Sequence, residues 1–382
     1  MKILNILLIL SLLSPFAFCG LAVFAGGDVG ATASDIYQSF VELATPSSKA
    51  AYIGVITAGS TWGTAKSIAQ GIVYRLKNIY GAANVEWLPF HTSNGNICTS
   101  SSLNDKLRSM TGLYFNGGET DMILDCLYPN GRVTSALSVI QSRYNSEDLA
   151  VFASSAGVLA MSSRSVIEDR ESWGSIHYGS LVDGNGGFNL FSFGFLDVHF
   201  TERGRQGRLI RTVVDRTSES TKGFGIDEST AMVIEGSRFT VAGTKGVYII
   251  HANEMTKFSG KRFKVENVKV SRLTKGDMYN FGSGTITWAS YKSTLTSSRQ
   301  NNVSATMSSN IFSAGTFATI ANGLFKSRLS SSTYGLTSET YPKYRVDMRK
   351  TSSSSGAIGV KDGIEQISYK NMYVDIECYQ NC

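Results

Sequence analysis

An apolar run, a turn of small residues and a second apolar segment follow one another at residues 149–163, which read LAVFASSAGVLAMSS. Residues 149–153 are typical of a buried strand, and the apolar positions after the turn are spaced as in a helix. A serine between small residues on such a turn projects its side chain into open space, as a catalytic nucleophile requires. The stretch therefore predicts an α/β fold with Ser155 as a candidate nucleophile. An ordinary tight turn between a strand and a helix would have the same pattern.

Similar units precede this stretch along the chain. Apolar runs that end in Gly-rich turns occupy residues 21–27, 51–60 and 113–118, and segments with helical spacing follow at 34–43, 64–80 and 121–127. Repeated strand–turn–helix units predict a doubly wound, mostly parallel sheet, with one further strand at 84–90. Such a sheet places its functional residues at the carboxyl ends of the strands, where all of these Gly-rich turns fall.

The pattern changes in the second half of the chain. Short apolar segments at 231–235, 239–242, 246–251 and 263–270 favour further strands. From about residue 290, Ser and Thr cluster while aromatic residues persist, which predicts a loop-rich, partly β subdomain rather than disorder. We therefore expect a main domain at 20–285 and an appended C-terminal extension at 286–382, closed near its end by cysteines.

The first residues of the chain predict secretion. A short charged start, Met1-Lys2, precedes an almost wholly apolar run to Phe18, and Ala17-Phe18-Cys19 resembles a small-residue cleavage site. Residues 1–19 are therefore interpreted as a signal peptide, and no later stretch is long and apolar enough to span a bilayer. The sequon that begins at Asn302 would carry a glycan if the cell glycosylates its secreted proteins.

Four cysteines remain after this segment. An even number in a secreted chain predicts two disulfides, with three connectivities open: Cys98, Cys126, Cys378 and Cys382. They form no paired Cys/His cluster, so we expect no metal. Residues 26–30, GGDVG, lack the full glycine spacing of a dinucleotide fingerprint, so we expect no cofactor. The net charge of +6 is modest and spread out, which does not favour nucleic-acid binding.

A serine nucleophile needs a base and an orienting carboxylate. Of the four histidines, His199 has the most suggestive surroundings, because an apolar run carries it to a polar, Arg-rich turn. The other three, His91, His177 and His251, are interpreted as hydrogen-bonded boundary residues. Asp227 and Glu228 end an apolar strand, a place that suits the carboxylate. The competing acids follow the serine turn: Glu168, Asp169 and Glu171.

Several motifs in this order resemble the cyanophycinase and aspartyl dipeptidase family of serine peptidases, over roughly residues 21–280. They are NGG at 116–118, SSAG at 154–157, DVHF at 197–200 with the arginines after it, and GIDESTA at 225–231. The resemblance implies a sheet related to that of class I glutamine amidotransferases. It also implies a triad of Ser155, His199 and Glu228, with Glu171 as runner-up for the acid. The backbone N–H groups of Gly118 and Ala156 would form the oxyanion hole.

The arginines after the base suggest the substrate. Arg presents a planar fork that suits carboxylates, so Arg203, Arg205 and Arg208 could select an acidic residue. Some of them could instead pair with acids of the protein itself. The sequence departs from the family at two places: Val198 stands where cyanophycinases have Gln, and Ala153 stands where the family has Gly. The first departure disfavours cyanophycin as the substrate.

These observations predict a secreted serine-type peptidase that cleaves peptide or isopeptide bonds near acidic residues. We expect a peptide substrate, no nucleic-acid partner and no membrane span, and a homodimer is one assembly that we consider. The alternative function is a catalytically inactive secreted binding protein that keeps the fold.

Overall fold

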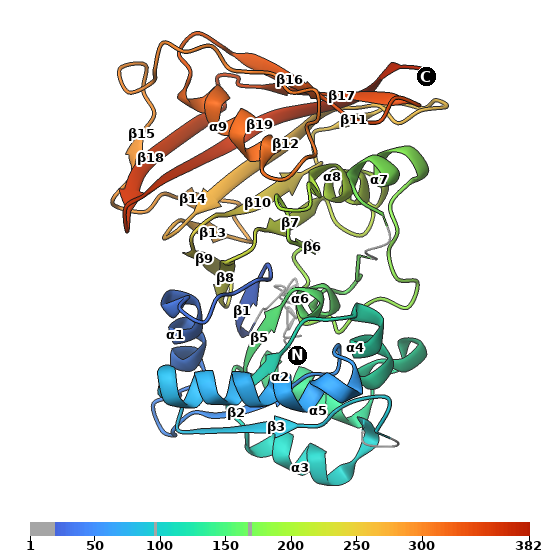
Figure 1. Ribbon diagram of the computed structural model, residues 1–382, viewed down its shortest axis with the longest axis vertical. Helices are drawn as coiled ribbons and strands as arrows, with labels where there is room; N and C mark the ends of the chain where they lie inside the picture. Colours follow the sequence, from blue (N-terminus) through green and yellow to red (C-terminus); the bar gives the residue numbers. More distant parts are fainter. Residues whose placement is uncertain (1–19, 95–97, 167–169) are drawn as a thin grey trace, which may run out of the picture.

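The computed structural model describes residues 20–94, 98–166 and 170–382 (Figure 1). The signal peptide expected at residues 1–19 lies outside the described residues. Within these ranges the strands form one nine-stranded and one ten-stranded sheet, which lie one above the other along the long axis of the molecule. Among the helices of the described ranges, none is long and apolar enough to cross a membrane.

The first sheet contains the parallel strands expected from the sequence. Its order is β14 (Ile286–Thr287), β13 (Met278–Asn280), β9 (Arg238–Gly243), β8 (Thr230–Glu235), β1 (Leu21–Ala25), β5 (Ala150–Ser154), β4 (Gly112–Phe115), β2 (Tyr52–Ile56) and β3 (Asn84–Leu88). The five strands from β1 to β3 in this order pair in parallel, whereas β8 pairs with β1 in antiparallel fashion, and β9, β13 and β14 continue that way. The sheet is therefore mixed, with a parallel half.

Helices cover both faces of the parallel half. Buried side chains of α1 (Ser34–Leu43) and α2 (Trp62–Tyr74) pack against one face, and a short π-helical segment (Arg75–Ile79) continues α2. The opposite face is covered by α3 (Ser101–Ser109), α4 (Thr120–Leu127), α5 (Ser135–Asn145) and α6 (Ala156–Met161). A 3₁₀ turn (Pro129–Gly131) lies between α4 and α5. This arrangement is the doubly wound part of the fold.

The second sheet is largely antiparallel. Its order is β15 (Ser293–Thr294), β18 (Ser355–Lys361), β19 (Ile364–Gln380), β12 (Val265–Thr274), β10 (Gly246–His251), β7 (Lys222–Ile226) and β6 (Phe195–Val198). Beside this path, β11 (Thr256–Lys257) pairs with β12, and the hairpin of β16 (Ser332–Leu336) and β17 (Lys343–Arg349) pairs through β17 with β19. Only β6 and β7 pair in parallel on this path within the described chain.

Alternating side chains join the second sheet to two different cores. Because successive residues of a strand point to opposite faces, Val247 and Ile249 pack into the core of the first sheet, whereas Tyr248 and Ile250 pack into a separate core. That second core is covered by α7 (Ser172–Tyr178), α8 (Gln206–Asp215) and α9 (Thr316–Lys326). The turns after β6 and β7 therefore lie where the two sheets meet.

The C-terminal extension is partly β, as the composition predicts, but it is not a separate appendage. It contributes α9 and the strands β14 to β19; β14 pairs with β13 of the first sheet, and β19 pairs with β12 of the second. Alternation of buried and exposed residues along β17 and β19 was hidden in the sequence by the Ser- and Thr-rich segments around them. Residues 286–382 therefore share a sheet and a core with residues before 286.

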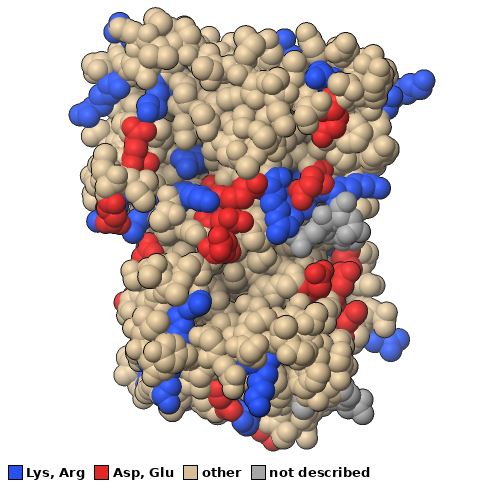
Figure 2. All heavy atoms as spheres, viewed as in Figure 1, with Lys and Arg blue, Asp and Glu red and all other residues tan. Residues whose placement is uncertain are grey.

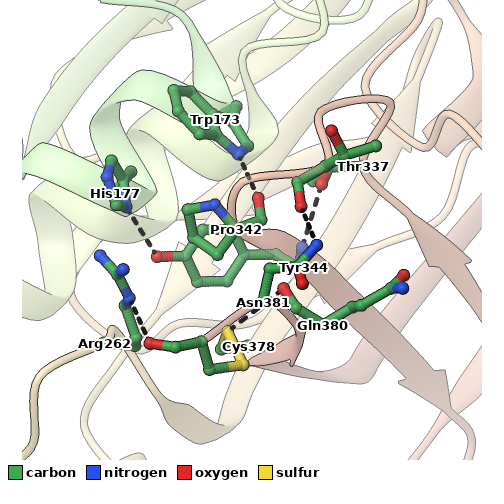
Figure 3. Close-up of a disulfide and its surroundings, with 11 residues drawn as sticks. Trp173, His177, Arg262, Thr337, Pro342, Tyr344, Cys378, Gln380 and Asn381 are labelled. Atoms are coloured by element: carbon green, nitrogen blue, oxygen red, sulfur yellow. Dashed lines mark hydrogen bonds between the residues drawn. A yellow bond between two sulfur atoms is a disulfide. The ribbon is translucent and has the colours of Figure 1, made fainter.

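Two disulfides resolve the connectivity that the sequence left open. Cys98 pairs with Cys126, and Cys378 pairs with Cys382 at the end of β19. Around the second bridge, Figure 3 shows α7 held against the C-terminal strands: Trp173 Nε1–H donates to Pro342 O at 2.9 Å, and His177 Nδ1 lies 3.3 Å from the Tyr344 hydroxyl. The extension thus contacts the helix that leads to α8.

Candidate active site

The carboxyl ends of the parallel strands meet at one place. The Ser155 N–H, after β5, donates to Ala25 O at the end of β1, at 3.0 Å. A Cβ on Gly117, after β4, would lie 2.9 Å from the Ser155 Cβ, and a Cβ on Gly118 would lie 1.9 Å from Gly59 O after β2. These close approaches explain why small residues stand at each strand end. They confirm that the Gly-rich turns gather at one edge of the sheet.

Ser155 lies on a strained turn between β5 and α6. Its backbone has φ 53° and ψ −125°, a conformation that non-glycine residues rarely adopt. The absence of a side chain at Gly157, in α6, allows the helix to pass close to β4, since a Cβ there would lie 3.1 Å from Phe115 O. Ala156 is the first residue of α6, so its N–H has no acceptor within the helix. This is the geometry of a nucleophile elbow.

His199 reaches the serine from the second sheet. It follows β6, adopts φ 47°, and its N–H donates to Gly26 O at 2.9 Å. Gly27 follows β1 and lies against the imidazole, since a Cβ built on it would lie 2.2 Å from the His199 Cε1. The turn after β1 thus holds His199 in two ways: Gly26 O accepts its N–H, and Gly27, which has no side chain, leaves room for the imidazole.

Ser155, His199 and Glu228 form a continuous chain of hydrogen bonds. The Ser155 Oγ lies 2.7 Å from His199 Nε2, and His199 Nδ1 lies 2.8 Å from Glu228 Oε1. The histidine side chain is 10% exposed and the glutamate side chain 23% exposed, so solvent reaches the site at its rim. Glu228 follows β7, the parallel neighbour of β6, which explains why its carboxylate meets the imidazole.

The competing assignments are placed elsewhere. Glu171 pairs with Arg205 Nε at 3.3 Å, and its side chain is 52% exposed. Glu168 and Asp169 lie outside the described residues. Each remaining histidine has its own partner: the Ser60 carbonyl for His91 at 2.7 Å, the Tyr344 hydroxyl for His177, and the Tyr279 hydroxyl for His251 at 3.4 Å.

A buried carboxyl group lies beside this hydrogen-bonded chain. Asp227 is 1% exposed, and burial, followed by the charge of Glu202, raises its pKa to about 7. Glu202 itself pairs with Lys245 Nζ at 2.7 Å. Figure 2 shows acidic and basic side chains side by side near the middle of the visible face. Within the described residues, no group of three or more His, Cys, Asp or Glu side chains could hold a metal ion.

Comparisons with known proteins agree with this geometry. The family model of peptidase family S51 matches residues 25–242, which include all three residues of the hydrogen-bonded chain. The chain belongs to peptidase family S51. It is a serine-type peptidase.

Named relatives of this S51 peptidase support the same family. Cyanophycinases of Trichormus variabilis and of a Nostoc species are each 28% identical to it over 243 residues, which cover 62% of this chain and 77% of theirs. The crystal structure of a peptidase from an acI-B1 actinobacterium shares its fold, with a TM-score of 0.53 and 16% identity. That match covers 69% of this chain and 98% of the other.

The arginines of the S51 peptidase correct one expectation. Arg205 and Arg208 are each 1% exposed, so neither is placed to meet a substrate carboxylate. Arg208 Nε donates to Asp197 Oδ2 at 2.9 Å, while Arg205 pairs with Glu171 and donates to Val198 O. A buried guanidinium needs such partners, because an unpaired charge in the interior is costly. Arg203 is the exposed member of the three.

Sequence reasoning missed several residues that hold the site. Gly26 and Gly27 were predicted as part of a Gly-rich turn at the functional edge of the sheet, but their contacts with His199 were not. Thr201 and Glu202 belong to no motif that predicts a role in the site. Their contacts join turns that are 26 residues apart in the chain, so no local pattern could have revealed them.

Proposed function

We propose that this chain is a secreted S51 peptidase in which Ser155 is the nucleophile, His199 the general base and acid, and Glu228 the orienting carboxylate. The observation that carries the proposal is the hydrogen-bonded chain from Ser155 Oγ through both ring nitrogens of His199 to Glu228. In this arrangement the Ser155 Oγ attacks the scissile carbonyl while Nε2 accepts its proton. The imidazolium then donates that proton to the leaving amine, and Glu228 stabilises the charged ring.

The oxyanion of the tetrahedral intermediate needs donors beside Ser155. We assign this role to the N–H groups of Ala156 and Gly118. Two features support the assignment. Ala156 begins α6, and Gly117 lies against the Ser155 side chain, since a Cβ on Gly117 would lie 3.4 Å from Ser155 Oγ. Gly118 has φ 131°, which a side chain would strain.

Labelling with a fluorophosphonate tests the nucleophile. Ser155→Ala should abolish both labelling and hydrolysis, with a loss of several orders of magnitude in turnover, while the fold is kept. Ser154 is the matched control, because it is the adjacent serine and lies on β5. Ser154→Ala should keep labelling. Near-wild-type hydrolysis by Ser155→Ala would refute the assignment, and a wild-type protein that neither labels nor hydrolyses any peptide would support the inactive binding protein instead.

The acid of the triad is tested by a pair of glutamates. Glu228→Gln keeps the size of the side chain but cannot stabilise the imidazolium, so kcat should fall by roughly 10²-fold or more. Glu171→Gln changes an exposed carboxylate that pairs with Arg205, and it should be nearly silent. The opposite order would assign the third role to Glu171.

For the substrate we propose peptides with an acidic residue near the scissile bond. Among the three arginines, only Arg203 still supports this preference, because it is exposed. Its neighbour Glu202 is already paired with Lys245. An exposed Arg–carboxylate contact is worth about 0–1 kcal/mol, which gives at most about fivefold selectivity. Val198 is fully buried, so its side chain cannot replace the family's Gln toward cyanophycin. Measuring kcat/KM for matched Asp and Asn peptides, in wild type and Arg203→Ala, tests the preference; equal values in wild type refute it.

Secretion is proposed on the signal-like residues 1–19 and agrees with the two disulfides, because such bonds persist in oxidising compartments. The sequon residue Asn302 is exposed, as a glycan site requires. Expression with the native N-terminus, followed by N-terminal sequencing of protein from the medium, tests the proposal. A mature chain that begins near residue 20 is expected, and retention of Met1 in the cell would refute it.

A further inference from the structure

The base and the acid of the proposed triad lie on two separate turns that must keep a fixed spacing. His199 directly follows β6, and Glu228 lies two residues after β7. Val198 and Ile226 are register partners at the ends of these parallel strands. Beyond them the sheet no longer pairs the two turns residue by residue, so their side chains must supply part of the connection.

Each turn supplies a carboxylate to the backbone of the other. Asp227, beside the acid, accepts the Thr201 N–H at 3.0 Å and the Thr201 hydroxyl at 2.7 Å, both on Oδ1. Glu202 lies on the turn after β6 that carries His199, here called the base turn, and it accepts the Glu228 N–H on Oε2 at 3.1 Å. The two turns are therefore tied reciprocally, by one carboxylate from each side.

The surroundings of these carboxylates fit a positioning role. Both Asp227 oxygens face donors, since Gly246 N–H donates to Oδ2 at 3.1 Å. The charged and titratable groups that act on Asp227 are Glu202, Lys245, Arg272, Tyr248 and Tyr369. Lys245 balances Glu202, whose Oε1 also lies 3.3 Å from the Thr201 hydroxyl. The carboxylates thus accept hydrogen bonds from the two turns and their neighbours.

The C-terminal extension holds the base turn from the other side. The Gly315 N–H donates to Thr201 O at 2.8 Å, and Phe312 O lies so close to Gly204 that a Cβ there would be 1.8 Å away. Thr201 is consequently fixed through its N–H, its hydroxyl and its carbonyl. Such over-determination is what a backbone with positive φ at His199 requires to persist.

We propose that Asp227, Glu202 and Thr201 are positioning residues. They connect the base turn to the acid turn, the turn after β7 that carries Glu228, and so hold His199 against Glu228. The proposal rests on the proposed function of the triad. None of the three side chains touches the reacting atoms, so their loss should lower kcat and leave KM nearly unchanged.

The same tie should respond to pH. Burial raises the pKa of Asp227 above its ordinary value, and a proton on either oxygen would oppose a donor that already faces it. The tie is therefore complete when Asp227 is ionised and weakens as pH falls through its pKa. The Thr201 hydroxyl stabilises the ionised form, so its removal should move the acid-side decline of kcat to higher pH.

Three threonine variants test the proposal. Thr201→Val removes the hydroxyl from the tie, and kcat should fall about tenfold to a hundredfold while KM stays within about threefold. Thr201→Ser keeps the hydroxyl and should restore most of kcat. Thr212→Val is the matched control, because Thr212 is buried in α8 and its hydroxyl donates to Arg208 O at 2.9 Å, away from the two turns. It should change stability without changing kcat or its pH profile.

A spectroscopic readout separates this inference from the proposed function. In ¹⁵N-histidine-labelled protein, the Nδ1–H of His199 should give a downfield proton resonance while it is bonded to Glu228. Ser155→Ala should keep this resonance although hydrolysis is lost, and Thr201→Val should broaden or lose it in either background. If Ser155→Ala retains hydrolysis, the triad is wrong; if Thr201→Val keeps the resonance, kcat and the pH profile of wild type, the positioning role is refuted.

Discussion

Gly27 is the residue at which a single methyl group should displace the imidazole of His199, the proposed base. Its φ is 109°, and a built Cβ would lie 2.2 Å from Cε1 and 2.6 Å from Nε2 of His199. Gly27→Ala must therefore displace the imidazole from Ser155, and we expect kcat/KM to fall by about a hundredfold. Gly30→Ala is the control, because nothing lies within 4 Å of its built Cβ. Comparable rates for the two variants would show that the imidazole does not rest on Gly27.

His251 should make the fold sensitive to acid. Burial, followed by the charges of Lys222 and Lys269, lowers its pKa to about 4, while in the unfolded chain it titrates near 6.5. The contribution of neutral His251 to the free energy of unfolding is therefore complete above about pH 6.5. It is lost as pH falls toward 4, because in this range only the unfolded chain takes up the proton. Urea unfolding at pH 7.5 and pH 4.5 should show wild type losing about 2 kcal/mol more than His251→Gln. Parallel losses would contradict the buried neutral imidazole.

At the scale of elements, the two disulfides should differ in their effect on stability. Cys98–Cys126 spans 28 residues and joins the segment just before α3 to α4, while Cys378–Cys382 spans 4 residues at the end of β19. The chain-entropy estimate gives about 3–4 kcal/mol for the longer loop and about 2 kcal/mol for the shorter one. Urea unfolding of the two double-alanine variants should therefore show the larger loss for Cys98/Cys126. The reverse order would mean that native contacts, rather than loop size, decide.

Elements with strong local patterns could be placed from the sequence. The helix expected at residues 34–43 and the strand expected at 246–251 have the bounds of α1 and β10. The extension resisted this reasoning. Its longest strand, β19, alternates buried and partly exposed residues only from Met372 to Glu377, among many polar side chains. Its partner β12 lies about a hundred residues earlier in the chain, so the pairing has no local signal.

At the scale of the whole molecule, the extension should be required for folding. The core of the second sheet combines Val268 and Val270 of β12 with Tyr369 and Val374 of β19. A chain ended after residue 290 would leave β12 with an unpaired apolar edge, which favours aggregation. We expect residues 20–290 to give no cooperative unfolding transition, whereas 20–382 unfolds cooperatively. A soluble, cooperatively folded 20–290 fragment would show that the extension is an independent appendage.

The sequence by itself determined the strand–turn–helix units, the strand ends that carry small residues, and Ser155 and His199 as candidates, whereas the choice of Glu228 among the acids came from the resemblance of its motif to a family. The units, the strand ends and the serine turn have a local signal, because strand periodicity and sharp turns restrict the residues that can stand there. Only the tertiary structure decided that Arg205 and Arg208 are buried among acids of the protein, that the tail completes the second sheet, and that Thr201 meets Asp227. Those contacts join segments distant along the chain, and burial, charge pairing and strand register become defined only once the segments pack together.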